Sequence, residues 1–176
     1  RYELGYSFDQ VSQYLSSDLD DALTAFSSQP KVWVEPFISD KPETDIKASE
    51  GTRYSVSEIV NEASSTVIQA PAQFGLSCLA RYLAQQAWQA SPSSRWVCLD
   101  ARQLKPTKNN VLKAVAKDLK RTGQKETDVG CIILDSWRTS DRNAVHILKT
   151  ICETFQHLPV FVMQTVDGQS PISPFD

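Results

Sequence analysis

Four short apolar runs constrain the fold of this chain more than any other feature. They read "STVIQA", "RWVCLD", "CIILD" and "PVFVMQT", and helices are predicted between them over residues 76–90, 109–121 and 141–155. Apolar runs without polar alternation are typical of strands buried on both faces of a sheet. Alternation of such strands with helices predicts a parallel sheet with right-handed crossovers. We therefore expect a three-layer α/β domain with at least four strands.

The N-terminal part of the chain has a different pattern. Residues 7–29 carry apolar side chains near the helical repeat, which predicts one helix, or two short ones with the second capped by Ser17. The run "KVWVEPF" predicts a short strand, and the polar, acidic residues 39–53 predict a linker. We expect an N-terminal helical segment with its strand and linker over residues 1–53, and the α/β domain over 54–176, where Ser55 begins a short helix.

Composition and charge narrow the classes of function. The chain has 176 residues and a net charge of −3, which gives no general attraction for nucleic acids or anionic membranes. No apolar run approaches the roughly 20 residues of a membrane-spanning helix, and no signal peptide opens the chain. The cysteines lack C-x-x-C spacing and lie in apolar segments, which indicates free thiols in a reducing, cytoplasmic location. They are Cys78, Cys98, Cys131 and Cys152.

One predicted helix carries several basic residues at helical spacing, namely Lys113, Lys117, Lys120 and Arg121. Such a pattern is typical of a solvated helix face, although a nucleic-acid-binding patch has the same signature. Because the chain as a whole is acidic, we favour the solvated face and do not expect a nucleic-acid partner.

Ligands of α/β sheets bind at the carboxyl ends of the strands. Three such ends are "QAPAQFGLS", "LDSWRTSD" and "MQTVDG". The first two follow the order in which P-loop NTPases present their phosphate loop and their magnesium aspartate, and "LSCLARYLAQQAW" is similar to the helix after the loop in STAND proteins. The chain thus resembles the P-loop class that includes the AAA+ and STAND (NACHT-like) ATPases. The resemblance implies a P-loop NTPase sheet, here truncated at its C-terminal end.

The phosphate-loop motif G-x-x-x-x-G-K-[ST] is only partly kept. Gly75 matches the second glycine and Ser77 the hydroxyl, whereas Ala70 replaces the first glycine and Leu76 replaces the lysine. The lysine of this motif reaches the β- and γ-phosphates, and leucine cannot offset their charge. The resemblance therefore marks a vestigial nucleotide site.

Three further residues complete the expectations for this loop. Gln73 and Phe74 occupy its tip, where we expect them to pack the loop rather than to fill the phosphate position. Arg81 lies one turn beyond Ser77 and is the nearest replacement cation, although an arginine there is expected to face solvent or the preceding helix.

The other strand ends carry the remaining candidates. The resemblance assigns Asp135 to orient magnesium, with Ser77 as the second ligand, but the residue that follows is Ser136 where active ATPases carry an acid. Asp135 also fits a simpler interpretation, as a strand-end cap for the following turn. A polar sensor of the γ-phosphate would be Gln164 or Thr165, and the role of Asp100 stays open.

Because the first motif lacks its lysine and the second lacks the acid that would follow Asp135, we expect no hydrolysis. The resemblance then implies a catalytically degenerate regulatory or protein-interaction module of a larger multidomain protein, without a cofactor. Its partner would be a protein or an adjoining effector domain, and an oligomer is compatible with it. The layout is also similar to the C-terminal part of calcineurin-like phosphoesterase proteins, in which another domain would be catalytic. The alternative is a STAND-type switch or ATPase that binds Mg-ATP through a non-standard loop.

Overall fold

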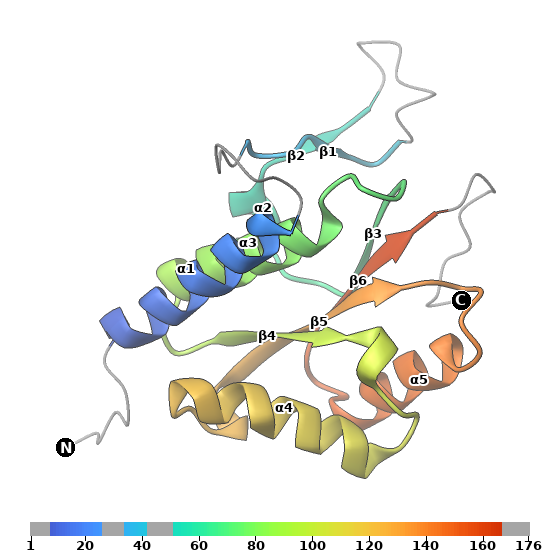
Figure 1. Cartoon of the computed structure of the whole chain (residues 1–176). Coiled ribbons are helices and arrows are strands. Elements are labelled where there is room, and N and C mark those ends of the chain that lie inside the picture. The colour runs from blue at the N-terminus through green and yellow to red at the C-terminus, as the bar shows by residue number, and fades with distance from the viewer. Residues whose placement is uncertain (1–7, 26–33, 42–50, 167–176) are drawn as a thin grey trace.

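The computed structural model describes residues 8–25, 34–41 and 51–166 and shows an α/β fold around one parallel sheet (Figure 1). The four strands lie in the order β3-β6-β5-β4. They are β3 (Thr66–Ala70), β4 (Arg95–Asp100), β5 (Val129–Trp137) and β6 (Val160–Thr165). Each neighbouring pair is parallel, so all four carboxyl ends meet at one edge. The predicted parallel sheet with four strands is confirmed.

Helices cover both faces of the sheet and make three layers. On one face lie α2 (Val56–Asn61) and α3 (Leu76–Ala90), and on the other lie α4 (Lys108–Thr122) and α5 (Ala144–Thr154). Successive strand residues serve opposite faces, so Ile133 packs with α3 while Ile132 packs with α4 and α5. Two short 3₁₀ helices, Ala101–Gln103 and Glu126–Asp128, complete the domain.

Helix α1 (Phe8–Thr24) lies along α3, on its outer side (Figure 1). Val11 and Leu15 are buried with Trp88 of α3, so the apolar stripe of α1 faces the domain. Ser17 lies inside this helix and begins no second one, so the prediction of two helices is wrong within the described residues. The helical repeat of apolar residues continues unbroken past Ser17 to Leu19, which keeps the helix on one surface.

The short strand expected from "KVWVEPF" is wrong over residues 34–37, while 31–33 lie outside the described residues. The strand instead begins later: β1 (Ile38–Ser39) pairs antiparallel with β2 (Arg53–Tyr54). Pro36 has no N–H to give to a ladder, which disfavours pairing before Ile38. This pairing joins the two ends of the predicted linker, of which residues 42–50 lie outside the described part.

Some predicted helix boundaries agree with the structure and others are shifted. Helix α3 has the predicted bounds, and α2 begins at the predicted Ser55, which forms a capping box with Glu58. Helix α5 begins at Ala144 rather than at Asp141, because the N–H of Ala144 closes a turn on the carbonyl of Asp141 at 3.0 Å. Strand β5 runs beyond the predicted "CIILD" at both ends.

All four cysteines carry free thiols, and two of them, Cys78 and Cys131, are buried. Cys98 and Cys152 are half-buried. Of the helices that the structure describes, none has both the length and the apolar character that crossing a bilayer requires.

Candidate functional site

The loop between β3 and α3, residues 71–75, lies at the carboxyl edge of the sheet and carries unusual backbone geometry. Gly75 has φ 79° and Gln73 has φ 72°, both in the left-handed region. Glycine adopts such angles without strain, whereas a glutamine there is strained and strain of this kind gathers at functional sites. Gly75 is also the N-cap of α3, and no side chain caps this helix end. The sequence at this loop is therefore held in a specific, costly conformation.

Asp135 does not end its strand. Strand β5 continues to Trp137, while its register with β6 shifts between Leu134 and Trp137. The shift coincides with Ser136, whose φ is 58° and whose N–H donates to Asp135 Oδ1 at 2.7 Å. An irregularity of this type re-aims side chains at a sheet edge. The interpretation of Asp135 as a cap for a turn directly after the strand is therefore wrong.

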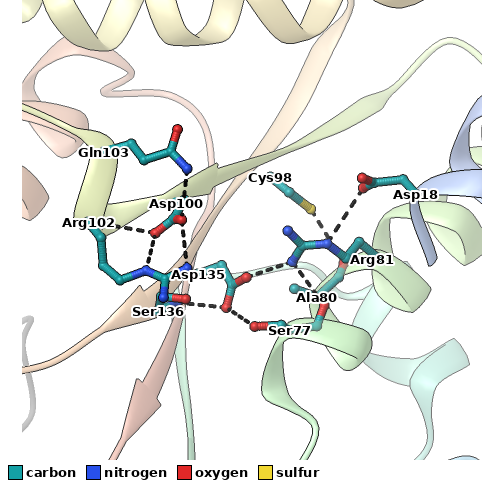
Figure 2. A network of polar contacts seen from close by, with 10 residues as sticks. All are labelled: Asp18, Ser77, Ala80, Arg81, Cys98, Asp100, Arg102, Gln103, Asp135 and Ser136. Carbon is teal, nitrogen blue, oxygen red and sulfur yellow. Dashed lines mark hydrogen bonds and ion pairs between the residues drawn. The ribbon is translucent and has the colours of Figure 1, made fainter. Parts of the chain in front are cut away.

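The carboxylate of Asp135 is held by Ser77 and Arg81 of α3 (Figure 2). Ser77 Oγ donates to Asp135 Oδ1 at 3.0 Å, and Arg81 Nη1 donates to Asp135 Oδ2 at 2.6 Å. The Asp135 side chain is only 4% exposed, so its charge depends on these donors and on the Ser136 N–H. The predicted pair of Ser77 and Asp135 does come together, but as a direct hydrogen bond beside a guanidinium.

Of the two orientations expected for Arg81, toward solvent or toward the preceding helix, the first is wrong. Its guanidinium points into the protein, toward Asp135, and its Nε faces Asp18 of the earlier helix α1. The Nε lies 3.7 Å from Asp18 Oδ2, and Nη1 donates to the Ser77 carbonyl at 3.0 Å. Burial disfavours the charged form of Arg81, but the acidic groups around it outweigh burial and raise the pKa of Arg81. In decreasing order of effect these groups are Cys98, when ionised, Asp135 and Asp18. Because burial raises the pKa of Cys98 to about 12, its thiol is neutral at pH 7. The two aspartates are therefore the anions that hold Arg81.

A hollow of about 70 Å³ lies between the loop and the strand ends. Ligand pockets usually measure about 300–1,000 Å³, so this one has room for water or a very small group only. Among the predicted site residues, Ala70 and Gln164 do not line it. The lining residues are Pro71, Gln73, Phe74, Gly75, Leu76, Ser77, Asp135, Ser136, Met163 and Thr165.

The two candidate sensor residues are separated by the alternation of β6. Thr165 lines the hollow, whereas Gln164 is 3% exposed and its Oε1 accepts a 2.9 Å hydrogen bond from Gln69 Nε2. Gln69 and Gln164 are register partners on adjacent strands, so this bond ties β3 to β6. Gln164 is thus engaged within the sheet, away from the hollow.

The tip of the loop is more open than expected. Phe74 is 62% exposed, so the expectation that it packs the loop is wrong. The left-handed Gln73 turns the chain just before Phe74, which lines the rim of the hollow while most of its surface stays exposed. Gln73 itself lines the hollow.

Sequence reasoning left Asp100 open and missed its partner, Arg102. Arg102 Nε and Nη2 donate to Asp100 Oδ1 and Oδ2 at 2.9 and 2.8 Å, a two-pronged pair (Figure 2). Burial raises the pKa of Asp100, but the hydrogen bonds and charge of Arg102, helped by Gln103, outweigh burial and lower the pKa. Asp100 is also the register partner of Asp135 on the neighbouring strand. Two adjacent aspartates at the sheet edge thus each have their own arginine.

The sequence indicates the ion-pair partners Arg102, Arg81 and Asp18 to different degrees. Arg102 lies two positions after Asp100, a spacing that local capping geometry could have suggested. Arg81 was noticed as a cation, but its partner was not predicted. Asp18 gave no signal, since only the packing of α1 on α3 brings it to Arg81.

The basic residues of α4 lie apart from this site. Lys113, Lys117 and Lys120 are exposed on a helix that covers the sheet face opposite α3. Arg121 donates to the hydroxyl of Tyr14 at 3.3 Å, so it links α4 to α1. None of these cations lines the hollow.

Comparisons of this chain with protein-family models, with curated proteins and with solved structures found no match.

Proposed function

We propose that residues 54–176 form a P-loop NTPase-like domain that does not hydrolyse nucleotide and serves as a regulatory or protein-interaction module. The strand order supports the proposal, because β6 lies between the strand of the loop and the strand of Asp135. The same spatial order is expected in the class that includes AAA+ and STAND proteins. The five-residue loop and the immediate start of α3 at Leu76 also fit a phosphate loop in length.

The contact between Arg81 and Asp135 carries the proposal. In active P-loop proteins, the residues that correspond to Ser77 and Asp135 hold magnesium. Here these two side chains bond to each other, and Arg81 Nη1 already lies 2.6 Å from the carboxylate. A magnesium ion needs oxygen ligands in near-ideal octahedral geometry and would be repelled by the guanidinium. In this arrangement the residues do not fit the ion.

Two departures from the P-loop motifs, Leu76 and Ser136, also argue against hydrolysis. Leu76 lines the hollow where the motif has its lysine, so no side-chain cation of the loop faces a phosphate. Ser136 follows Asp135 where an acid would activate water, and a serine hydroxyl is a poor base. Phosphoryl transfer depends on charge stabilisation and positioning, both of which are weakened here. We therefore assign no catalytic residue to this domain.

With hydrolysis disfavoured, we propose an interaction role for this loop. Its exposed tip presents the ring of Phe74, and aromatic side chains are frequent anchors of protein interfaces. We propose an adjoining effector domain or a second protein as the partner, in a reducing compartment. Any hydrolytic activity of the larger protein would belong to another domain, such as a phosphoesterase.

Calorimetric titration with ATP, ADP and GTP in the presence of magnesium tests this proposal. We expect no saturable binding and no turnover for the unmodified chain. Asp135→Ala and the control Asp141→Ala, which removes an exposed carboxylate from the loop after β5, should leave this result unchanged. Micromolar binding with turnover that Asp135→Ala abolishes and Asp141→Ala preserves would establish the Mg-ATP switch instead.

A further inference from the structure

Helix α4 concentrates positive charge on a protein that is acidic as a whole. Its 15 residues include five basic side chains and one carboxylate, Asp118, whereas the chain has a net charge of −3. Asp118 turns inward, where Arg95 Nη2 donates to its Oδ2 at 3.1 Å. The outward face of α4 is therefore basic and has no anion of its own helix to balance it.

Three lysines form the centre of this face, namely Lys113, Lys117 and Lys120, and they are called the lysine stripe below. Their spacing of four and three residues places them on one side of the helix, and all three are exposed. The stripe spans about 10 Å along the helix axis, from the rise per residue of an α-helix. No carboxylate of the described residues forms an ion pair with any of the three.

The neighbouring helix α5 has the charge pattern of an ordinary solvated face. Its Lys149 lies 3.8 Å from Glu153, an opposite charge at the i,i+4 spacing. By contrast, the positions one turn from each lysine of the stripe hold Asn, Ala, Lys, Arg, Gly and Gln, and no acid. Like charges at this spacing destabilise a helix, and alternating signs are usual on a solvated face. Solvation alone does not account for a stripe whose members repel one another.

The fold holds the stripe in a fixed position. Val111, Val115 and Leu119, on the opposite side of α4, are at most 2% exposed. Thr107 caps the first turn, and Gly123 ends the helix in the left-handed conformation. Helix α4 lies on the outside of the sheet, beside α5 (Figure 1). Because the charges are aligned on a rigid helix, a partner that binds them loses less entropy.

We propose that the lysine stripe is a docking surface for a carboxylate-rich segment of a partner protein. Carboxylates spaced one turn apart on a partner helix would face the three lysines and offset their mutual repulsion. Association of this kind is fast and depends strongly on salt. The inference goes beyond the proposed function, because the stripe lies on the sheet face opposite α3 and uses no residue of the carboxyl edge.

The surroundings of the stripe favour a protein over a nucleic acid. Helix α4 contains no aromatic residue on which a base could stack, and the stripe has no arginine, the side chain that binds phosphate through two parallel hydrogen bonds. Double-stranded DNA carries a charge at roughly every 1.7 Å and extends far beyond the stripe. Acidic groups flank α4: Glu126 follows it, and α1, which Arg121 links to it, has four aspartates and no basic residue. They repel a long polyanion more than a short acidic segment.

Fluorescence anisotropy with a labelled, alanine-rich helical peptide tests the proposal. The peptide carries glutamates at positions i, i+4 and i+7, and a control peptide of the same composition has its glutamates spread around the helix. The stripe variant, Lys113→Gln with Lys117→Gln and Lys120→Gln, removes the three charges, and glutamine is a good helix former. Circular dichroism verifies that this variant folds.

A matched control variant separates the stripe from net charge. Arg138→Gln with Arg142→Gln and Lys149→Gln removes the same charge from exposed residues of α5 and the loop before it. We expect the glutamate peptide to bind the unmodified chain about tenfold more tightly than the stripe variant, the size expected of three exposed ion pairs. The control variant should stay within about twofold of the unmodified chain, and the control peptide should bind several-fold more weakly.

Thermal unfolding supplies the second measurement. The melting midpoint of the stripe variant should equal or exceed that of the unmodified chain, because the repulsion between neighbouring lysines is removed. Lysines that stabilise α4 would instead lower the midpoint when they are replaced. That outcome would overturn the interpretation of the stripe as a binding surface.

Each contrary result of the titrations has a definite meaning. Equal binding to the stripe and control variants, or no binding at all, would overturn the proposal. Tighter binding of duplex DNA or of phosphatidylserine vesicles than of the peptide would replace the protein partner by a phosphate-bearing one. Self-association at low salt that the stripe variant loses would replace the separate partner by a second copy of the chain. None of these results bears on the nucleotide titration, so failure of the docking surface and failure of the proposed function are distinguishable.

Discussion

Two largely buried arginine–aspartate pairs in this molecule differ in which partner is more deeply buried, the aspartate in one and the arginine in the other. In the pair at the carboxyl edge, the Asp135 side chain is 4% exposed and Arg81 is 21% exposed. In the second pair, Arg95 is 3% exposed and Asp118 is 15% exposed, with Nη2 to Oδ2 at 3.1 Å. Helix α1 touches both pairs, through Asp18 in the first and Tyr14 in the second.

The second pair has the properties of a structural joint. Arg95 begins β4, at the amino edge of the sheet, and its Nη1 donates to the carbonyl of Trp96. The ring of Tyr14 lies 6.0 Å from its guanidinium, and the Tyr14 hydroxyl donates to Asp118. Burial raises the pKa of Asp118 although Arg95 opposes this effect. Three elements, α1, β4 and α4, meet at this joint.

The comparison shows that an ion pair by itself does not mark a functional site. Arg81 and Asp135 differ in their place, at the edge where α/β sheets bind ligands. They lie next to a hollow and to two left-handed residues other than glycine, Gln73 and Ser136. The pair of Arg95 and Asp118 lies at the opposite edge. Variants that separate stability from ligand access would sharpen this difference.

The largest effect is expected for Arg95→Met. Removal of one partner from a buried ion pair leaves an uncompensated charge and costs about 3–5 kcal/mol of stability. Urea denaturation measures the loss, with Lys113→Met on the exposed face of α4 as the control. A cost below about 1 kcal/mol would contradict a structural joint, since exposed pairs have values of that size.

Arg81→Met should destabilise the chain less, by about 1–3 kcal/mol. Asp135 keeps two donors, Ser77 Oγ and the Ser136 N–H, so its desolvation is partly compensated. The same denaturation experiment gives the comparison. If Arg81→Met costs more stability than Arg95→Met, the contrast between the two ion pairs is wrong.

The smallest change in stability is expected for Asp100→Asn, and it should depend on pH. Because the folded pKa of Asp100 is lowered, its contribution is present above the ordinary carboxyl pKa of about 3.9 and is lost as pH falls through the folded value. Since Arg102 is 69% exposed, the contribution should remain below about 1 kcal/mol. Denaturation from neutral to acidic pH should show the difference between Asp100→Asn and the unmodified chain shrinking. A difference that grows on acidification would reverse the sign we assign.

Local patterns in the sequence predicted the layers of this fold well. Helix α3 and the capping box at Ser55 were predicted because apolar repeats and capping residues act within a few positions. Local patterns gave wrong predictions where the structure depends on contacts between distant segments. Pro36 belongs to no described strand, and Phe74 stays exposed at the loop tip.

The candidate site was predicted in its members but not in its connections. Hydrophobic periodicity indicates which side is buried, but it does not indicate which polar group a buried charge will meet. The partnership of Arg81 with Asp135 and Asp18 depends on the packing of α1, α3 and β5, which lie far apart along the chain. Motif comparison found Asp135 and the cation Arg81, but it missed Asp18 and the contact between Arg81 and Asp135.

Among the described residues, strand β3 lies at one border of the sheet, and this position affects how the protein behaves at high concentration. Among the described residues, β3 pairs with β6 on one side only, and four of its five residues stay half-buried. A strand border with free backbone groups is a template for pairing with another chain, and β-branched residues such as Thr66 and Val67 favour it. Self-association through this border should therefore set the limit of solubility, and a lysine in place of Thr66 should raise that limit.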